Sequence, residues 1–373
     1  MTNYPLSTHR VGTGASYGAI VDDEHAKRAV ESAIANMEGD TIGSVLLFLS
    51  SSYAHSPQNA IKEAAKAAST PQIFGCCALS LLTEEEWLMD VEGAVAMVFP
   101  PDLALQPLAV MERLDVKPSM VLTLSSPNAS TIAVNSTDCS QLGSIASDEY
   151  GHGPFSVWGA GRIEEHEFSL TAFPKKLEAH ILIANGVKRL SPTLQINRAQ
   201  AHSLKEVDQG PAFASIPSQL QEMAVKQPYN LLCAISENSN VDSIEQGFYK
   251  LHHVVSIDQN SGIIQLSGSP KSGRHLFWAI RDADQAKASM QAQLSTLTEK
   301  LESAPIFGLL FPNMSRGAEF FGGRDLDHDC VVDSLPDVPI IGFYGNGEIT
   351  PGYLDSSLIR RYCTVLAVYT ESN

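Results

Sequence analysis

An internal repeat is the feature of this sequence that most constrains its fold. Residues 44–99 and 305–369 carry an apolar run, a helix-like segment, a second apolar run with a glycine, and a last apolar run, in the same order and at similar spacings. The sequence before Gly75 (PQIFG) also resembles that before Gly342 (VPIIG). Because repeats normally mark repeated structural units, we expect these segments to superpose with Gly75 equivalent to Gly342. The alternative is that strand-helix-strand units of this length are common in α/β proteins.

The apolar runs predict buried strands, and the segments between them predict helices. SVLLFL (44–49) and PIFGLLF (305–311) are short apolar runs, as are strands covered on both faces. Residues 57–68 have proline at the first helical position. Residues 100–280 contain short strand-like runs, and QNSG at 259–262 favours an antiparallel hairpin. We therefore predict a mixed α/β (α+β) fold of two related halves, each a mixed sheet with flanking helices, in a pseudo-duplicated two-domain body.

Length and charge exclude several classes of protein. At 373 residues the chain exceeds the size that one hydrophobic core usually supports. The formal net charge of −17 argues against nucleic-acid binding, which requires clustered Lys and Arg. The start of the sequence lacks the layout of a signal peptide, and no apolar run is long enough to cross a bilayer. We expect a cytoplasmic protein that binds neither nucleic acid nor membrane.

The six cysteines form no disulfide or zinc pattern, because none is spaced as C-x-x-C. Cys76 or Cys77 could act as a nucleophile with His55 as its base, in a hydrolase or transferase. The alternative is that both are buried thiols of an apolar strand. Motifs of common hydrolases and nucleotide-binding enzymes are missing from the sequence, so we assign no catalytic residue.

The C-terminal quarter carries an ordered series of short motifs: FGLLF (307–311), SRG (315–317), IGFY (341–344) and GEI-x-P (347–351). Together they resemble the C-terminal domain of the FIST family. The signature of that domain has an Arg-Gly after a buried strand and then a Gly-Phe-x-x-x-Gly-Glu-Ile-x-Pro stretch.

Weaker marks of the FIST N-terminal domain lie upstream, at 44–77 and 207–212. The resemblance implies an N-terminal domain over 10–228 and a C-terminal domain over 229–370. It also implies intracellular signal transduction, with an amino acid or similar small anion as the ligand and a histidine kinase or other signalling protein as the partner. Some bacterial members resemble haem-binding nitric-oxide sensors, so haem is the alternative ligand.

Two loops at the ends of predicted strands are the candidate binding site, at 50–56 and 312–317. Such loops present free backbone N–H groups, and ligands gather there in open α/β sheets. Arg316 offers a bidentate fork for a carboxylate and Glu348 a partner for an ammonium group. The alternative is that these two pair with each other.

If the two halves pack face to face, the loops border a single cavity. No metal site is expected, unless His55 ligates the iron of a haem. The candidate ligand-binding residues are Ser51, Tyr53, His55, Asn313, Arg316, Tyr344, Asn346 and Glu348.

Overall fold

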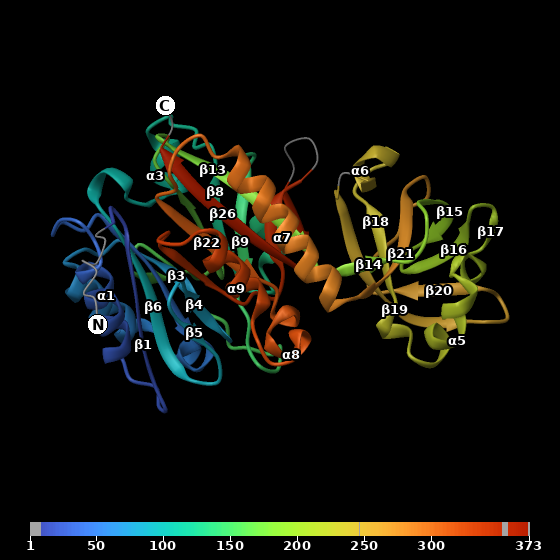
Figure 1. Cartoon of the computed structure of the whole chain (residues 1–373), viewed down its shortest axis with the longest axis horizontal. Coiled ribbons are helices and arrows are strands. Elements are labelled where there is room, and N and C mark those ends of the chain that lie inside the picture. The colour runs from blue at the N-terminus through green and yellow to red at the C-terminus, as the bar shows by residue number, and fades with distance from the viewer. Residues whose placement is uncertain (1–8, 246, 353–356, 372–373) are drawn as a thin grey trace.

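The computed structural model describes residues 9–245, 247–352 and 357–371. The chain forms a body of three mixed sheets and a smaller β-barrel lobe beside it (Figure 1). Residues 187–281 form the lobe, and the rest of the described chain forms the body. The fold is thus mixed α/β, with helices covering the sheets, as predicted.

The first sheet of the body has a parallel pair of strands, β2 and β3, at its centre and antiparallel neighbours on either side. Both strands are buried along their whole length, which explains their unbroken apolar sequences. From edge to edge the strands are β1 (Gly12–Gly18), β6 (Glu92–Phe99), β2 (Ser44–Ser50), β3 (Ile73–Ala78), β10 (Val157–Gly159) and β11 (Arg162–Ile163).

The other two sheets repeat this pattern, with the parallel pair again in third and fourth place. The second sheet contains β7 (Gln106–Pro107), β12 (Phe168–Ala172), β8 (Val121–Ser125), β9 (Gln141–Ile145), β24 (Glu348–Pro351) and β25 (Ser357–Arg360). The third contains β13 (Leu177–Asn185), β26 (Cys363–Glu371), β22 (Phe307–Pro312), β23 (Ile340–Phe343), β4 (Leu81–Thr83) and β5 (Trp87–Leu88).

The body therefore consists of three copies of one unit, at residues 12–99, 106–172 and 177–371, the last interrupted by the lobe. Each unit sends a hairpin into the sheet of another unit. Hairpin β4–β5 of the first unit joins the third sheet, β10–β11 of the second joins the first, and β24–β25 of the third joins the second. The three units are thereby interlocked in a ring.

A glycine at the same place in each unit sets the spacing of the parallel strands. The pairs are Gly75 with Leu47, Gly143 with Thr123, and Gly342 with Leu310. A Cβ atom on these glycines would lie 1.7, 1.9 and 1.6 Å from the carbonyl oxygen of the partner residue. Only glycine fits such a close approach. The predicted equivalence of Gly75 and Gly342 is confirmed, and Gly143 extends it to a third unit.

The inner faces of the three sheets share one hydrophobic core. Three aromatic rings meet there: Phe99 at the end of β6, Phe173 directly after β12, and Tyr369 near the end of β26. Ring centroids are 5.9 Å apart for Phe99 and Phe173 and 4.7 Å apart for Phe173 and Tyr369.

Helices cover the outer faces of the sheets. The first sheet is covered by α1 (Glu24–Ala35) and α2 (Gln58–Ala68), the second by α3 (Leu108–Arg113) and α4 (Ser130–Val134), and the third by α7 (Ala283–Lys300) and α9 (Leu326–Ser334). The short α8 (Ala318–Phe321) follows β22 and lies at the end of the third sheet that faces the lobe (Figure 1).

Six strands close the lobe into a barrel around its own apolar core. They are β21 (His275–Arg281), β15 (Leu194–Gln200), β16 (Ser203–Val207), β20 (Ile263–Leu266), β19 (Tyr249–Asp258) and β18 (Leu232–Ser236). Outside this ring lie β14 (Val187–Arg189), β17 (Gly210–Pro211), α5 (Ser218–Lys226) and α6 (Val241–Glu245). The hairpin predicted at 259–262 joins β19 to β20.

The lobe is inserted between β13 and α7 of the third unit. The chain enters it at Gly186 and leaves it at Asp282, whose N–H donates to the Gly186 carbonyl at 3.2 Å. The expected boundary between residues 228 and 229 falls inside the lobe, between α5 and β18. No helix in the described ranges is both long and apolar enough to cross a membrane.

Candidate functional site

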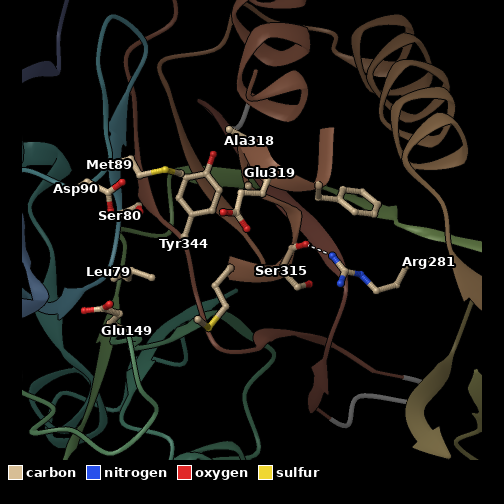
Figure 2. Close-up of a pocket in the computed structure, with 13 residues that line it drawn as sticks. Leu79, Ser80, Met89, Asp90, Glu149, Arg281, Ser315, Ala318, Glu319 and Tyr344 are labelled. Carbon is tan, nitrogen blue, oxygen red and sulfur yellow. Dashed lines mark hydrogen bonds between the residues drawn. The ribbon is translucent and has the colours of Figure 1, made fainter. Parts of the chain in front are cut away.

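A pocket of about 750 Å³ lies where the body meets the barrel lobe. Its wall combines Ser80 after β3, Met89 after β5, the segment after β22, and Arg281, the last residue of barrel strand β21 (Figure 2). Small-molecule sites in proteins typically have volumes of about 300–1,000 Å³. The pocket can therefore hold a small metabolite.

Tyr344 lines this pocket, and its ring points into it (Figure 2). The residue is 2% exposed, and its hydroxyl has no hydrogen-bond partner among the described residues. Its N–H donates to the Ser80 carbonyl at 3.0 Å, and its carbonyl accepts from the Ser147 hydroxyl, so two other units fix its backbone. A buried hydroxyl without a partner is unfavourable by roughly 1–3 kcal/mol. The position therefore favours a bound group that completes the hydrogen bond.

Arg281 brings a guanidinium group from the barrel to the edge of the pocket. It donates a hydrogen bond to the Ser315 carbonyl, and its Cζ atom lies 4.7 Å from the centroid of the Phe320 ring. Partial burial lowers the pKa of Arg281, but an arginine stays charged at neutral pH. No acidic side chain in the described part of the chain pairs with it. Its remaining N–H groups can bind a carboxylate.

Arg316, a predicted ligand-binding residue, makes its hydrogen bonds inside the protein. It is 1% exposed, and its Nε and Nη2 atoms donate to the two carboxylate oxygens of Asp327 at 2.8 and 2.7 Å. Its Nη1 atom donates to the Ala184 carbonyl at 3.3 Å. Arg316 is therefore internally paired, with Asp327 rather than with Glu348. The guanidinium at the pocket belongs to Arg281, which was not among the residues predicted from the sequence.

Glu348 is fully buried and forms part of the support behind the pocket. The Asn313 side-chain amide donates to both of its carboxylate oxygens at 3.0 and 3.2 Å, and the Cys363 thiol lies 3.4 Å away. Desolvation raises the pKa of Glu348 to about 8. The amide oxygen of Asn313 accepts from the Ser315 N–H at 3.2 Å. These bonds hold the segment after β22, which is one wall of the pocket.

Asn346 lies on the other side of that segment. A second cavity of about 290 Å³ there is lined by Asn313, Met314, Ser315, Asn346, Arg361 and Tyr362. The structure thus gathers the C-terminal group of predicted residues around one segment, with Tyr344 on the larger pocket and Asn313 and Asn346 on the smaller.

Ser51, Tyr53 and His55 belong to a different place in the body, in a short 3₁₀ helix after β2. The Tyr53 hydroxyl is bonded to the backbone of Asp22 at 2.8 and 3.0 Å, and His55 is exposed. None of the three lines the larger pocket. The loop after β2 borders the hairpin of the second unit, because the Ser156 hydroxyl donates to the carbonyl of Ala54 at 2.8 Å. The expectation that both loops border one cavity is wrong, since each loop faces a hairpin from a different unit.

Cys76 and Cys77 are both buried in β3. Burial raises the pKa of each thiol well above its usual range. A catalytic cysteine acts as the thiolate, so these positions support the structural interpretation of the pair.

Four charged residues of the pocket were not among the residues predicted from the sequence: Arg281, Asp90, Glu149 and Glu319. They come from separate segments of the chain and share no motif. The sequence offered one indication, for Arg281 alone: it is a charged residue at the end of the strand-like run at 275–281.

Models of known families match most of the chain. The FIST N domain matches residues 44–209, and the FIST C domain matches residues 205–351. FIST domains are associated with signal transduction and small-ligand sensing.

Similar proteins include two from Mycobacterium tuberculosis, "Uncharacterized protein MT0656" of strain CDC 1551 / Oshkosh and "Uncharacterized protein Rv0628c" of strain ATCC 25618 / H37Rv, each 29% identical over 106 residues. "Uncharacterized protein Mb0898c" of Mycobacterium bovis (strain ATCC BAA-935 / AF2122/97) is 26% identical over 106 residues. Each match covers 28% of this chain and 28% of the relative. With both of its domains matched in order, the chain belongs to the FIST family.

Proposed function

We propose that this protein is a cytoplasmic sensory protein that binds an amino acid or a similar small carboxylate in the pocket between body and lobe. The observation that carries the proposal is that one pocket is lined by two polar groups that can each bind a ligand. The Tyr344 hydroxyl has no hydrogen-bond partner in the described chain, and the Arg281 guanidinium has no acidic partner there. Both groups recognise carboxylates, and a guanidinium can do so with two parallel hydrogen bonds.

The rest of the lining suits an α-amino acid. Carboxylates at Asp90, Glu149 and Glu319 can accept from an ammonium group, while Met89 and Met314 offer apolar surface to a side chain. Ligand sites typically combine such apolar surface with a few polar groups that fix orientation.

The position of the pocket suggests how binding becomes a signal. Arg281 belongs to the lobe, and its hydrogen-bond partner Ser315 belongs to the body. A ligand held by both parts favours one orientation of the lobe over others, which is a shift in population. A partner such as a histidine kinase would respond to that shift.

Calorimetric titration of the full chain with a panel of amino acids tests the proposal. Replacing Arg281 by Ala is expected to weaken binding at least tenfold, or about 1.4 kcal/mol. Arg198→Ala is the matched control, because Arg198 lies in the same barrel but pairs on the surface with Glu206. An Arg281→Ala variant with wild-type affinity would remove this pocket as the binding site.

A further inference from the structure

Three carboxylates surround the pocket, one from each unit of the body. Asp90 follows hairpin β4–β5 of the first unit, Glu149 lies in the loop after β9 of the second, and Glu319 lies in α8 of the third. Figure 2 shows all three in the pocket wall, with Tyr344 between them. Arg281 is the one cationic side chain among the lining residues. The lining therefore has more negative than positive charge.

These carboxylates are not neutralised within the protein. All three are exposed, and across residues 9–245, 247–352 and 357–371 no Lys, Arg or His forms an ion pair with any of them. Asp90 adopts a left-handed backbone conformation, with φ at 55°, which Asp tolerates better than most residues. Like charges around one pocket repel each other, and a cation bound among them reduces that repulsion.

An independent observation marks the same place as a ligand site. The Tyr344 hydroxyl is buried, lacks a partner in the described chain, and belongs to a ring that points into the pocket (Figure 2). A cluster of acidic residues on an ordinary protein surface does not explain a buried hydroxyl without a hydrogen-bond partner, so this hydroxyl is separate evidence for a ligand. The three carboxylates line the same pocket as Tyr344, so a molecule bound there lies among all four side chains.

We infer that the pocket selects an α-amino acid with a cationic side chain, such as a diamino or guanidino acid. The inference rests on the proposed function and names the class of its ligand. A neutral amino acid gives its carboxylate to Arg281 and its ammonium group to one acid, which leaves two acids without a counter-charge. A second cationic group on the ligand supplies a counter-charge to these remaining acids. The net charge of −17 acts in the same direction, because it draws cations toward the protein and raises their association rate.

The sharpest test compares two ligands that differ only in the terminal ammonium group. L-lysine and L-norleucine have side chains of similar length, and only lysine carries the second cation. Calorimetric titration of the full chain is expected to show lysine binding at least tenfold more tightly, with a ratio that falls as salt is raised. Norleucine binding as tightly as lysine overturns the inference and leaves the proposed function standing. No binding by lysine, arginine, norleucine or glutamate at millimolar concentration overturns both.

Isosteric variants assign the selectivity to the three acids. The triple variant Asp90→Asn, Glu149→Gln, Glu319→Gln is expected to bring the lysine-to-norleucine ratio close to one. Both affinities should fall, because the acid that accepts the α-ammonium group is among the three, but lysine should lose more. Glu85→Gln is the matched control, because Glu85 is an exposed acid between β4 and β5 that does not line the pocket. Thermal melts check that both variants fold. A triple variant that folds and keeps the wild-type ratio overturns the inference.

Discussion

The guanidinium of Arg316 and the carboxylate of Asp327 form a buried bidentate ion pair, with both side chains 1% exposed. The pair is completed by the Thr364 hydroxyl, which donates to Asp327 at 2.6 Å, and by the Ala184 carbonyl, which accepts from Arg316. It therefore ties the segment after β22 to α9, β26 and β13. Its role is to hold the wall of the pocket in place.

Replacing Arg316 by Ala leaves the Asp327 carboxylate buried without its counter-charge. We expect a loss of about 3–5 kcal/mol in the free energy of unfolding, measured by urea denaturation. The double variant Arg316→Met, Asp327→Leu removes both charges and should lose much less. If Arg316→Ala stayed within 1 kcal/mol of wild type by the same measurement and lost ligand binding, Arg316 would belong to the site instead.

Glu348 gives the protein a distinct dependence of stability on pH. Its pKa is about 8 in the folded state and about 4.3 in an unfolded chain. Between these values the folded state holds a proton that the unfolded state has released, so stability falls as pH rises, by up to about 1.4 kcal/mol per unit. Above pH 8 this contribution stops changing.

The variant Glu348→Gln should lack this fall. Urea denaturation of both proteins from pH 5 to 9 gives the contribution of Glu348 as the difference between them. Parallel curves for wild type and variant would show that Glu348 is ionised in the folded protein.

The buried strands could be predicted from local sequence, because an unbroken apolar run by itself indicates a strand that is covered on both faces. The run at 44–49 is apolar after Ser44 and forms most of β2, which is buried on both faces. The second unit was not predicted from the sequence, because its helices are short and one of its central strands is not an apolar run. Helix α3 has six residues and α4 has five, and β9 reads QLGSI. The exchange of hairpins between units depends on pairings of residues far apart in the chain, such as Gly342 with Leu82, which no local pattern encodes.

The candidate site shows the same division. Sequence motifs identified Tyr344 and the segment around Asn313, which lie at the pocket or directly behind it. The partner of Arg316 could not be chosen from sequence, because Asp327 and Glu348 both follow it and only the direction of α9 brings Asp327 within reach. Arg281 belongs to another lobe, so its place at the pocket depends on how the lobe is joined to the body.

Because the three glycines are equivalent, replacing each of them by alanine is expected to reduce the stability of the protein to a similar extent. A Cβ atom at Gly342 would lie 1.6 Å from the Leu310 carbonyl oxygen, so Gly342→Ala must push two parallel strands apart. We expect a loss of about 1–3 kcal/mol or more in urea denaturation, and a similar loss for Gly75→Ala and Gly143→Ala. Gly308→Ala in neighbouring β22 is the control, because its nearest contacts are at 3.3 Å or more. Equal losses at Gly308 and Gly342 would contradict the close approach as the cause.

The last prediction separates the ligand-binding role of Tyr344 from its role in packing. Its hydroxyl and that of Tyr369 are both buried and without a partner in the described chain, but Tyr344 lines the pocket whereas Tyr369 packs against Phe173 in the shared core. Removing either hydroxyl by Tyr→Phe relieves an unsatisfied polar group, so neither variant should lose stability, and each is expected to gain up to about 1 kcal/mol.

Ligand affinity should respond differently in the two variants. Tyr344→Phe removes a hydrogen bond to the bound molecule and is expected to weaken binding about 5- to 10-fold, whereas Tyr369→Phe should bind as wild type. Thermal melts and calorimetric titration of both variants with the same amino acid measure the two effects side by side. Unchanged affinity in Tyr344→Phe, together with normal stability, would mean that the hydroxyl does not contact the ligand and that the molecule binds nearer to Arg281.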